Sequence, residues 1–172
     1  MIQETNPMIL TLALEREDLR FFDIQRKKYF PPARNFIDAH LTLFHALPFD
    51  EEVLLAITAL SNQQVPFVIH VKEPVSLGRG VAFNLESIEL MHLHEKLRSQ
   101  WLEFLSQQDK QKYWPHITVQ NKVTLPESQQ VLKELQDSFL PFIVTATGLQ
   151  LWEYMHGPWR FIKEFSFDGH VC

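Results

Sequence analysis

The chain has 172 residues, 45% of them hydrophobic, and a formal net charge of −5. This size and apolar content fit one globular domain with a sizeable core, and the negative charge argues against a protein that binds nucleic acid over a broad basic face. No stretch approaches the roughly 20 apolar residues of a membrane span, and Met1–Glu4 lack the basic and apolar regions of a secretory signal. The single cysteine, Cys172, excludes an intrachain disulfide, so we expect a cytoplasmic protein.

Apolar periodicity and turn residues predict a series of strands and helices of the α+β class. In chain order we expect strand 8–15, helix 17–30, strand 39–45, helix 51–63, strand 66–72, strand 81–86, helix 87–107, strand 115–121, helix 126–138, and strands 141–147, 149–155 and 159–167. Tight turns between several neighbours favour antiparallel pairing. The last two strands flank Met155-His156-Gly157-Pro158, which is typical of a hairpin turn.

Two segments of the chain repeat one order of elements. Residues 8–72 and 81–147 each read strand, helix, strand, helix, strand, and Pro66 and Pro141 occupy matching places before the third strand of each segment. Two repeats are too few for a solenoid. We therefore expect residues 1–172 to form a single domain of two interleaved pseudo-repeats with a closing hairpin over 149–167. Its two mainly antiparallel sheets would line a central groove, with the helices outside.

A tetrapeptide pattern, His-apolar-Thr-apolar, occurs at the same place in both segments: His40-Leu41-Thr42-Leu43 and His116-Ile117-Thr118-Val119. Successive side chains of a strand point to opposite faces. Each copy would therefore bury its two aliphatic residues and show its histidine and threonine on the other face. Two such strands facing each other would gather two imidazoles and two hydroxyls around one small site, a set that suits acid–base chemistry on a phosphoester.

The motif pair, its spacing, the Trp114-Pro115-His116 lead-in and the closing strand from Trp159 to Phe167 resemble the two-histidine phosphoesterase superfamily, in particular its bacterial 2′-5′ RNA ligase-like branch. The resemblance covers essentially the whole chain, because the duplication matches the family's bilobal layout. The family often has proline directly before the motif histidine. The second copy has Pro115 there, whereas the first has Ala39.

The resemblance implies a metal-independent enzyme without a cofactor that acts on 2′,3′-cyclic phosphates or 2′-5′-linked ribonucleotides. It assigns catalysis to His40 and His116, and phosphate binding to Thr42 and Thr118. One imidazole would take a proton from the attacking water or hydroxyl while the other gives one to the leaving oxygen. Which histidine is the base, and whether the chain hydrolyses or ligates, stay open.

Three residues near the C-terminus are weaker candidates for substrate binding. Trp152 and Tyr154 share a face of their predicted strand and could stack a nucleobase, although aromatic residues on strands more often belong to the core. Arg160 could pair with a phosphate, although a solvated arginine is the more common case.

The remaining histidines give no metal site in this interpretation. His92 and His94 lie two apart in a predicted helix, so their side chains point about 200° apart and cannot bind one ion together. His45 falls on the opposite face of its strand from Thr42, and we expect it to be a surface group at the strand end.

Two other functions stay open from the residues alone. A non-catalytic module could use the same groove to bind a nucleotide or RNA end, and a metallo-hydrolase could be distinguished by its sensitivity to chelators. For the enzyme we expect a small nucleotide or RNA end as substrate, no membrane association and no obligate protein partner.

Overall fold

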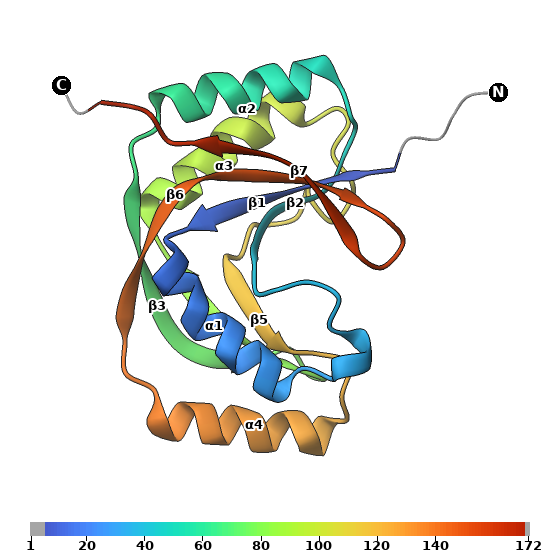
Figure 1. Cartoon of the computed structure of the whole chain (residues 1–172), viewed down its shortest axis with the longest axis vertical. Helices are drawn as coiled ribbons and strands as arrows, with labels where there is room; N and C mark the ends of the chain where they lie inside the picture. Colours follow the sequence, from blue (N-terminus) through green and yellow to red (C-terminus); the bar gives the residue numbers. More distant parts are fainter. Residues whose placement is uncertain (1–5, 171–172) are drawn as a thin grey trace.

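The computed structural model describes residues 6–170, so Cys172 and Met1–Glu4 lie outside the part of the chain discussed below. It is an α+β fold, as predicted (Figure 1). The strands are β1 (Met8–Leu14), β2 (Leu41–Leu47), β3 (Phe67–Ser76), β4 (Val81–Glu86), β5 (His116–Gln120), β6 (Phe142–Tyr154) and β7 (Trp159–Ser166). The α-helices are α1 (Arg16–Tyr29), α2 (Glu51–Gln63), α3 (Ile88–Trp101) and α4 (Leu125–Ser138), and a short 3-10 turn covers Pro32–Arg34.

All strand pairs are antiparallel, in the order β2-β1-β6-β3-β4-β5, with β7 also paired to β6. The expected antiparallel pairing and outer helices are confirmed, but the two expected sheets are joined into one, because β3 pairs with β6 at the centre. Figure 1 shows this sheet curling between α2 at one end of the molecule and α4 at the other.

The third strand of each half pairs with the first strand of the other half. Strand β3 lies beside β4, and β6 lies beside β1. Such an exchange is what two interleaved pseudo-repeats would produce, and it supports that proposal for residues 8–72 and 81–147. The motif strands β2 and β5 are the two ends of the strand order, yet they contact each other, because the curl of the sheet brings its edges together.

Local sequence explains where three of the helices begin. The side chain of Asp50 accepts a hydrogen bond from the Glu52 amide at the start of α2, and Ser87 accepts one from Leu90 at the start of α3. Thr124 and Glu127 form a reciprocal capping box at the start of α4. These caps satisfy amide groups that have no partner within the helix.

Several predicted boundaries differ from the structure: β3 runs to Ser76 and not to 72, and the largest differences lie in β6 and α3. The strands expected at 141–147 and 149–155 form the single strand β6, which passes through Gly148 without a break. A Cβ at Gly148 would lie 2.5 Å from the Phe165 carbonyl oxygen, so glycine there permits close pairing with β7 and does not mark a turn. Helix α3 ends at Trp101 and not at 107, and the loop 102–115 that follows returns to β2.

None of the helices within residues 6–170 is both long enough and apolar enough to cross a bilayer.

A stack of three rings joins α3 and the loop after it to β2. The imidazole of His94 lies between the rings of Phe44 and Tyr113, with centroid separations of 4.6 and 3.8 Å. Its Nε2 donates to the Leu43 carbonyl oxygen at 3.2 Å. Burial lowers the pKa of His94 to about 4, so this ring is a neutral part of the core at neutral pH.

We expect acidification to destabilise the protein in part through His94. Since its pKa in the folded state lies below the ordinary 6.5, the unfolded chain binds a proton between pH 6.5 and about 4 that the folded chain does not. The stability from neutral His94 is therefore complete above pH 6.5 and is lost as the pH falls toward 4. The test is urea unfolding of the wild type and of His94→Gln, whose side chain can still donate to Leu43, at pH 7 and at pH 4.5. Between these two pH values the free energy of unfolding should fall by about 2 kcal/mol less in His94→Gln than in the wild type.

The exposed His92 of the same helix provides the matched substitution, because His92→Gln removes a histidine that lies outside the ring stack. If the free energy of unfolding falls equally in the wild type and in His94→Gln, this pH dependence does not come from His94.

Candidate active site

The two motif strands line one cavity of about 290 Å³ where the edges of the sheet meet. The alternation expected of each copy is present: Leu41, Leu43, Ile117 and Val119 are at most 1% exposed. The motif histidines and threonines, His40, Thr42, His116 and Thr118, all line the cavity. The structure therefore brings together the four residues that the sequence analysis assigned to catalysis and phosphate binding.

Both motif histidines are held in the same way. Nδ1 of His40 lies 2.7 Å from the Asp38 carbonyl oxygen, and Nδ1 of His116 lies 2.8 Å from the Trp114 carbonyl oxygen. A carbonyl oxygen only accepts hydrogen bonds, so Nδ1 carries the proton in both neutral rings. The lone pair is then on Nε2, which is the atom that can exchange a proton with a ligand.

Burial controls the charge of both rings. It lowers the pKa of His40 to about 4, against a smaller upward contribution from the hydrogen bond to Asp38. Burial also lowers the pKa of His116, against the hydrogen bond to Trp114. Both imidazoles are therefore neutral at neutral pH in the ligand-free protein. A bound anion would favour the protonated form, because opposite charges stabilise each other at short range.

The motif threonines present their hydroxyls to the cavity, and their backbone carbonyl oxygens accept hydrogen bonds from side chains of other elements. Within residues 6–170 neither hydroxyl has a hydrogen-bond partner in the protein. The Thr42 carbonyl accepts from the Tyr113 hydroxyl at 3.1 Å, and the Thr118 carbonyl accepts from the buried Arg26 at 2.9 Å. Because β2 and β5 are edge strands, these side chains occupy backbone acceptors that no neighbouring strand covers.

A tryptophan lies against each motif histidine. Trp114 stacks on His116 with a centroid separation of 4.3 Å, and Trp159 lies 4.6 Å from His40. Both line the central cavity. Trp159 and His40 also line a second cavity of about 420 Å³ on the side of β1, α1 and residues 35–39, so they form the wall between the two.

The three weaker candidates do not reach the central cavity. Trp152 lines only the second cavity, where its indole N–H donates to Thr11. Tyr154 lines neither of these cavities and lies beside His156. Arg160 is exposed on β7, is paired with Glu153 and also lines neither. Trp159, the third aromatic residue of this hairpin, is the one that the structure places in the groove.

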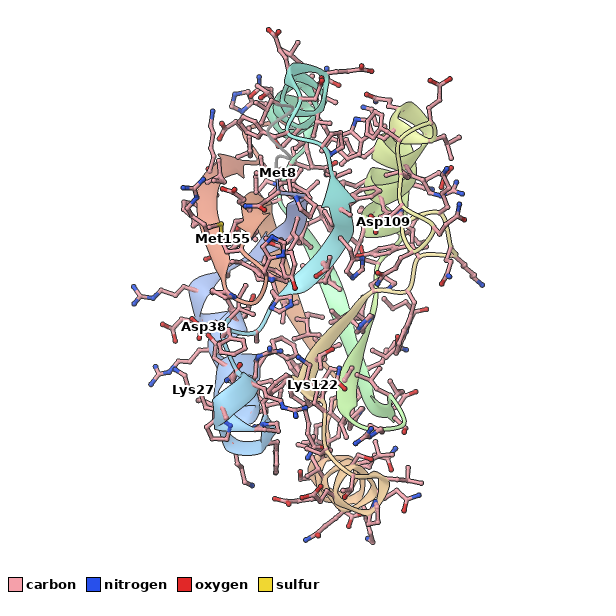
Figure 2. All side chains as sticks on the ribbon, turned by 90° about the vertical axis from the view of Figure 1, so that its right-hand side faces the viewer. Met8, Lys27, Asp38, Asp109, Lys122 and Met155 are labelled. Atoms are coloured by element: carbon pink, nitrogen blue, oxygen red, sulfur yellow. The ribbon has the colours of Figure 1, made fainter. Side chains whose placement is uncertain are left out.

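His45 is exposed, as expected, but the face of the strand predicted for it was wrong. A register irregularity in β2 between Thr42 and Phe44 makes Leu43 and Phe44 successive buried residues. Such a bulge reverses the alternation of faces, so His45 lines the same cavity as Thr42. Its Nδ1 lies 3.0 Å from Oδ1 of Asp109, a residue that the sequence analysis did not identify. Figure 2 shows Asp109 on the loop after α3, beside β2.

Asp109 is a buried carboxylate that connects this loop to β2. It accepts hydrogen bonds from the His45 ring, the backbone amides of His45 and Ala46, and the Ser106 hydroxyl. Burial would raise its pKa, but the bonds from His45 and Ala46 outweigh that effect and lower it, so the group is ionised. An Asp and a His 64 residues apart, with no motif spacing, gave no signal in the sequence.

The residues from 6 to 170 include no group of three or more His, Cys, Asp or Glu side chains placed to hold a metal ion. His92 is exposed and His94 is buried, in agreement with their expected divergence on the helix.

Comparison with known proteins identifies the family of this chain. The profile of the 2′-5′ RNA ligase superfamily matches residues 12–158. No curated protein matches the sequence.

Solved structures share the fold over nearly the whole chain. TT0787 of Thermus thermophilus is 18% identical with a TM-score of 0.68, covering 96% of this chain and 100% of its own. E. coli LigT complexed with 3′-AMP is 21% identical with a TM-score of 0.63, covering 95% and 99%. A crystal structure described as a phosphoesterase is 19% identical with a TM-score of 0.62, covering 94% and 98%. Because the superfamily profile matches most of the sequence, this chain belongs to the 2′-5′ RNA ligase superfamily, as the paired His-x-Thr motifs predicted.

Proposed function

We propose that this chain is a metal-independent phosphoesterase that acts on 2′,3′-cyclic phosphate or 2′-5′-linked ribonucleotides through His40 and His116. The observation that carries the proposal is the matched pair of hydrogen bonds from Nδ1 to a backbone carbonyl, which leaves both Nε2 atoms available in one groove. Two imidazoles held in one tautomer, with two free hydroxyls between aromatic walls, form an acid–base pair around a site for one phosphate.

The reaction needs one imidazole neutral and the other protonated. For a cyclic phosphate, the neutral Nε2 takes a proton from water as the water oxygen bonds to phosphorus. The ring P–O bond breaks, and the protonated Nε2 of the other histidine gives its proton to the leaving ribose oxygen. A ribose hydroxyl in place of water would give ligation. The Thr42 and Thr118 hydroxyls would donate to the non-bridging oxygens, on which negative charge grows.

The likeness to LigT supports nucleotides as ligands. LigT has been crystallised with 3′-AMP, NADP+ and ATP. A groove of the same fold in this chain, with Trp114 and Trp159 beside the histidines, offers ring faces on which a nucleobase can stack.

Replacing either motif histidine should abolish turnover without unfolding the protein. We expect His40→Gln and His116→Gln each to lower kcat for a 2′,3′-cyclic phosphate oligonucleotide by about 10²–10⁴-fold in EDTA, the usual size of a general acid or base contribution. His92→Gln is the matched control, since it removes an exposed histidine outside the cavity. Product release is followed by chromatography, and folding by urea unfolding.

The outcomes separate the functions that the sequence left open. Turnover that depends on both histidines and persists in EDTA supports the proposal. A folded wild type that binds nucleotide without turnover would favour the binding module, and activity that disappears in EDTA would favour a metallo-hydrolase.

The activity should be greatest on the acid side of pH 6.5. The base must be unprotonated and the acid protonated, and the pKa values of both free rings lie below the ordinary 6.5, at about 4 for His40. We expect kcat/KM, which reports the free protein, to pass through a maximum below pH 6.5 and to fall as the pH rises above it. The profile of kcat should lie at higher pH, because bound phosphate stabilises the imidazolium. Steady-state rates from pH 4.5 to 8.5 test this, and a kcat/KM maximum above pH 7.5 would contradict it.

Truncating Trp159, one of the two tryptophans that line the groove, should weaken substrate binding. Trp159→Ala removes a ring that lines both cavities, and stacking on one aromatic side chain contributes about 1–3 kcal/mol per base. We expect KM to rise by about tenfold or more. Tyr154→Ala, on the same hairpin but outside both cavities, should leave KM within twofold of the wild type. A larger rise in KM for Tyr154→Ala than for Trp159→Ala would instead support Tyr154 as the stacking residue, as the sequence suggested.

A further inference from the structure

One end of the groove carries polar groups that the proposed reaction does not use. His45, Gln108, Gln111 and Lys112 line the central cavity together with the motif residues. His45 comes from β2 after the bulge, and the other three come from the loop between α3 and β5. The second motif has no such neighbour, because β5 ends at Gln120 and Asn121 lies outside the cavity.

The contact of Asp109 with Nδ1 of His45 leaves the other ring nitrogen, Nε2, available to the groove. The carboxylate side chain is 1% exposed and holds Nδ1, whereas the His45 side chain is 45% exposed. Within the described part of the chain Nε2 has no hydrogen-bond partner. In the imidazolium both ring nitrogens are donors, so one can stay on Asp109 while Nε2–H points to an anion.

Lys112 brings a positive charge to this end of the groove, beside the buried Asp109 carboxylate, which also lines the cavity. Lys112 has no carboxylate within 4.0 Å among residues 6–170. Asp109 is buried and accepts from four donor groups, so its own hydrogen-bonding capacity is already satisfied by the protein. The amides of Gln108 and Gln111 add neutral donors.

The position of His45 is one step beyond the reacting phosphate along β2. His40 and Thr42 are successive residues on the groove face, and the bulge makes His45 the next. A nucleotide chain likewise carries its next phosphate one nucleoside away from the first, with the sugar between them.

We propose that His45 and Lys112 form a second phosphate subsite, through which the protein selects ribonucleotides that carry another phosphate beside the reacting one, as an RNA 3′ end does. This inference rests on the proposed function, because it places the reacting phosphate between His40 and His116. His45 is here a substrate-binding residue and takes no part in proton transfer.

Equilibrium binding tests the subsite without requiring turnover. Calorimetric titration compares adenosine 3′-monophosphate with adenosine 3′,5′-bisphosphate at one ionic strength. We expect the wild type to bind the bisphosphate about tenfold more tightly, the effect of one charge-assisted hydrogen bond. His45→Asn keeps an amide donor for Asp109 but lacks the outer nitrogen. It should bring the ratio of the two affinities close to one, because it weakens binding of the bisphosphate more than binding of the monophosphate.

Lys112→Ala should lower the same ratio, whereas Lys110→Ala, in the same loop but outside the cavity, should keep it. A ratio near one in the wild type, or an unchanged ratio in both His45→Asn and Lys112→Ala, would overturn the subsite. An equal loss of affinity for both ligands in His45→Asn would assign His45 to the loop structure and overturn it too.

The two proposals can fail separately. Preference for the bisphosphate without turnover of cyclic phosphates would support the subsite and overturn the enzyme. Turnover without the preference would overturn the subsite alone. A wild type that binds neither ligand at millimolar concentration would overturn both.

Discussion

The site depends on the curl of a single antiparallel sheet, which brings its two edge strands face to face. Strands β2 and β5 are the ends of the strand order, and they contact each other because β3 and β6 pair at the centre and the sheet bends around that pair. An edge strand has backbone groups without a sheet partner, and these must be satisfied in another way. Here Tyr113, Arg26 and Asp109 bind them, so the same contacts that close the edges also hold the motif residues in place.

Burial and backbone hydrogen bonds together determine the charge and the tautomer of the two motif histidines. Enclosing the imidazoles in a groove lowers their pKa values, and the carbonyls of Asp38 and Trp114 select the tautomer with Nε2 free. The groove is therefore neutral at these rings until an anion arrives. In the proposed reaction a phosphate would supply the opposite charge that favours one imidazolium, and binding would then be coupled to the protonation state that the proposed mechanism needs.

The hairpin of β6 and β7 shows how one close backbone contact shapes the site. Gly148 lets β6 continue past Phe165 as one strand, and the hairpin carries Trp159 back toward His40. Trp159 then separates the central cavity from the second one. With sequence identity near 20% to the solved structures, the fold is what this chain shares with them.

Some properties could be predicted from the sequence because they depend on local periodicity. The alternation of His40, Leu41, Thr42 and Leu43 determined which side chains are buried, and the two copies of the motif indicated the family. Capping residues such as Ser87 and Thr124 mark the starts of helices in the same local way. The bulge that turns His45 into the groove, the contact between His45 and Asp109, and the passage of β6 through Gly148 depend on pairing with strands distant in sequence. Only the tertiary structure decided these, because a one-residue change of register reverses every side chain that follows it, and periodicity alone does not show where the register changes.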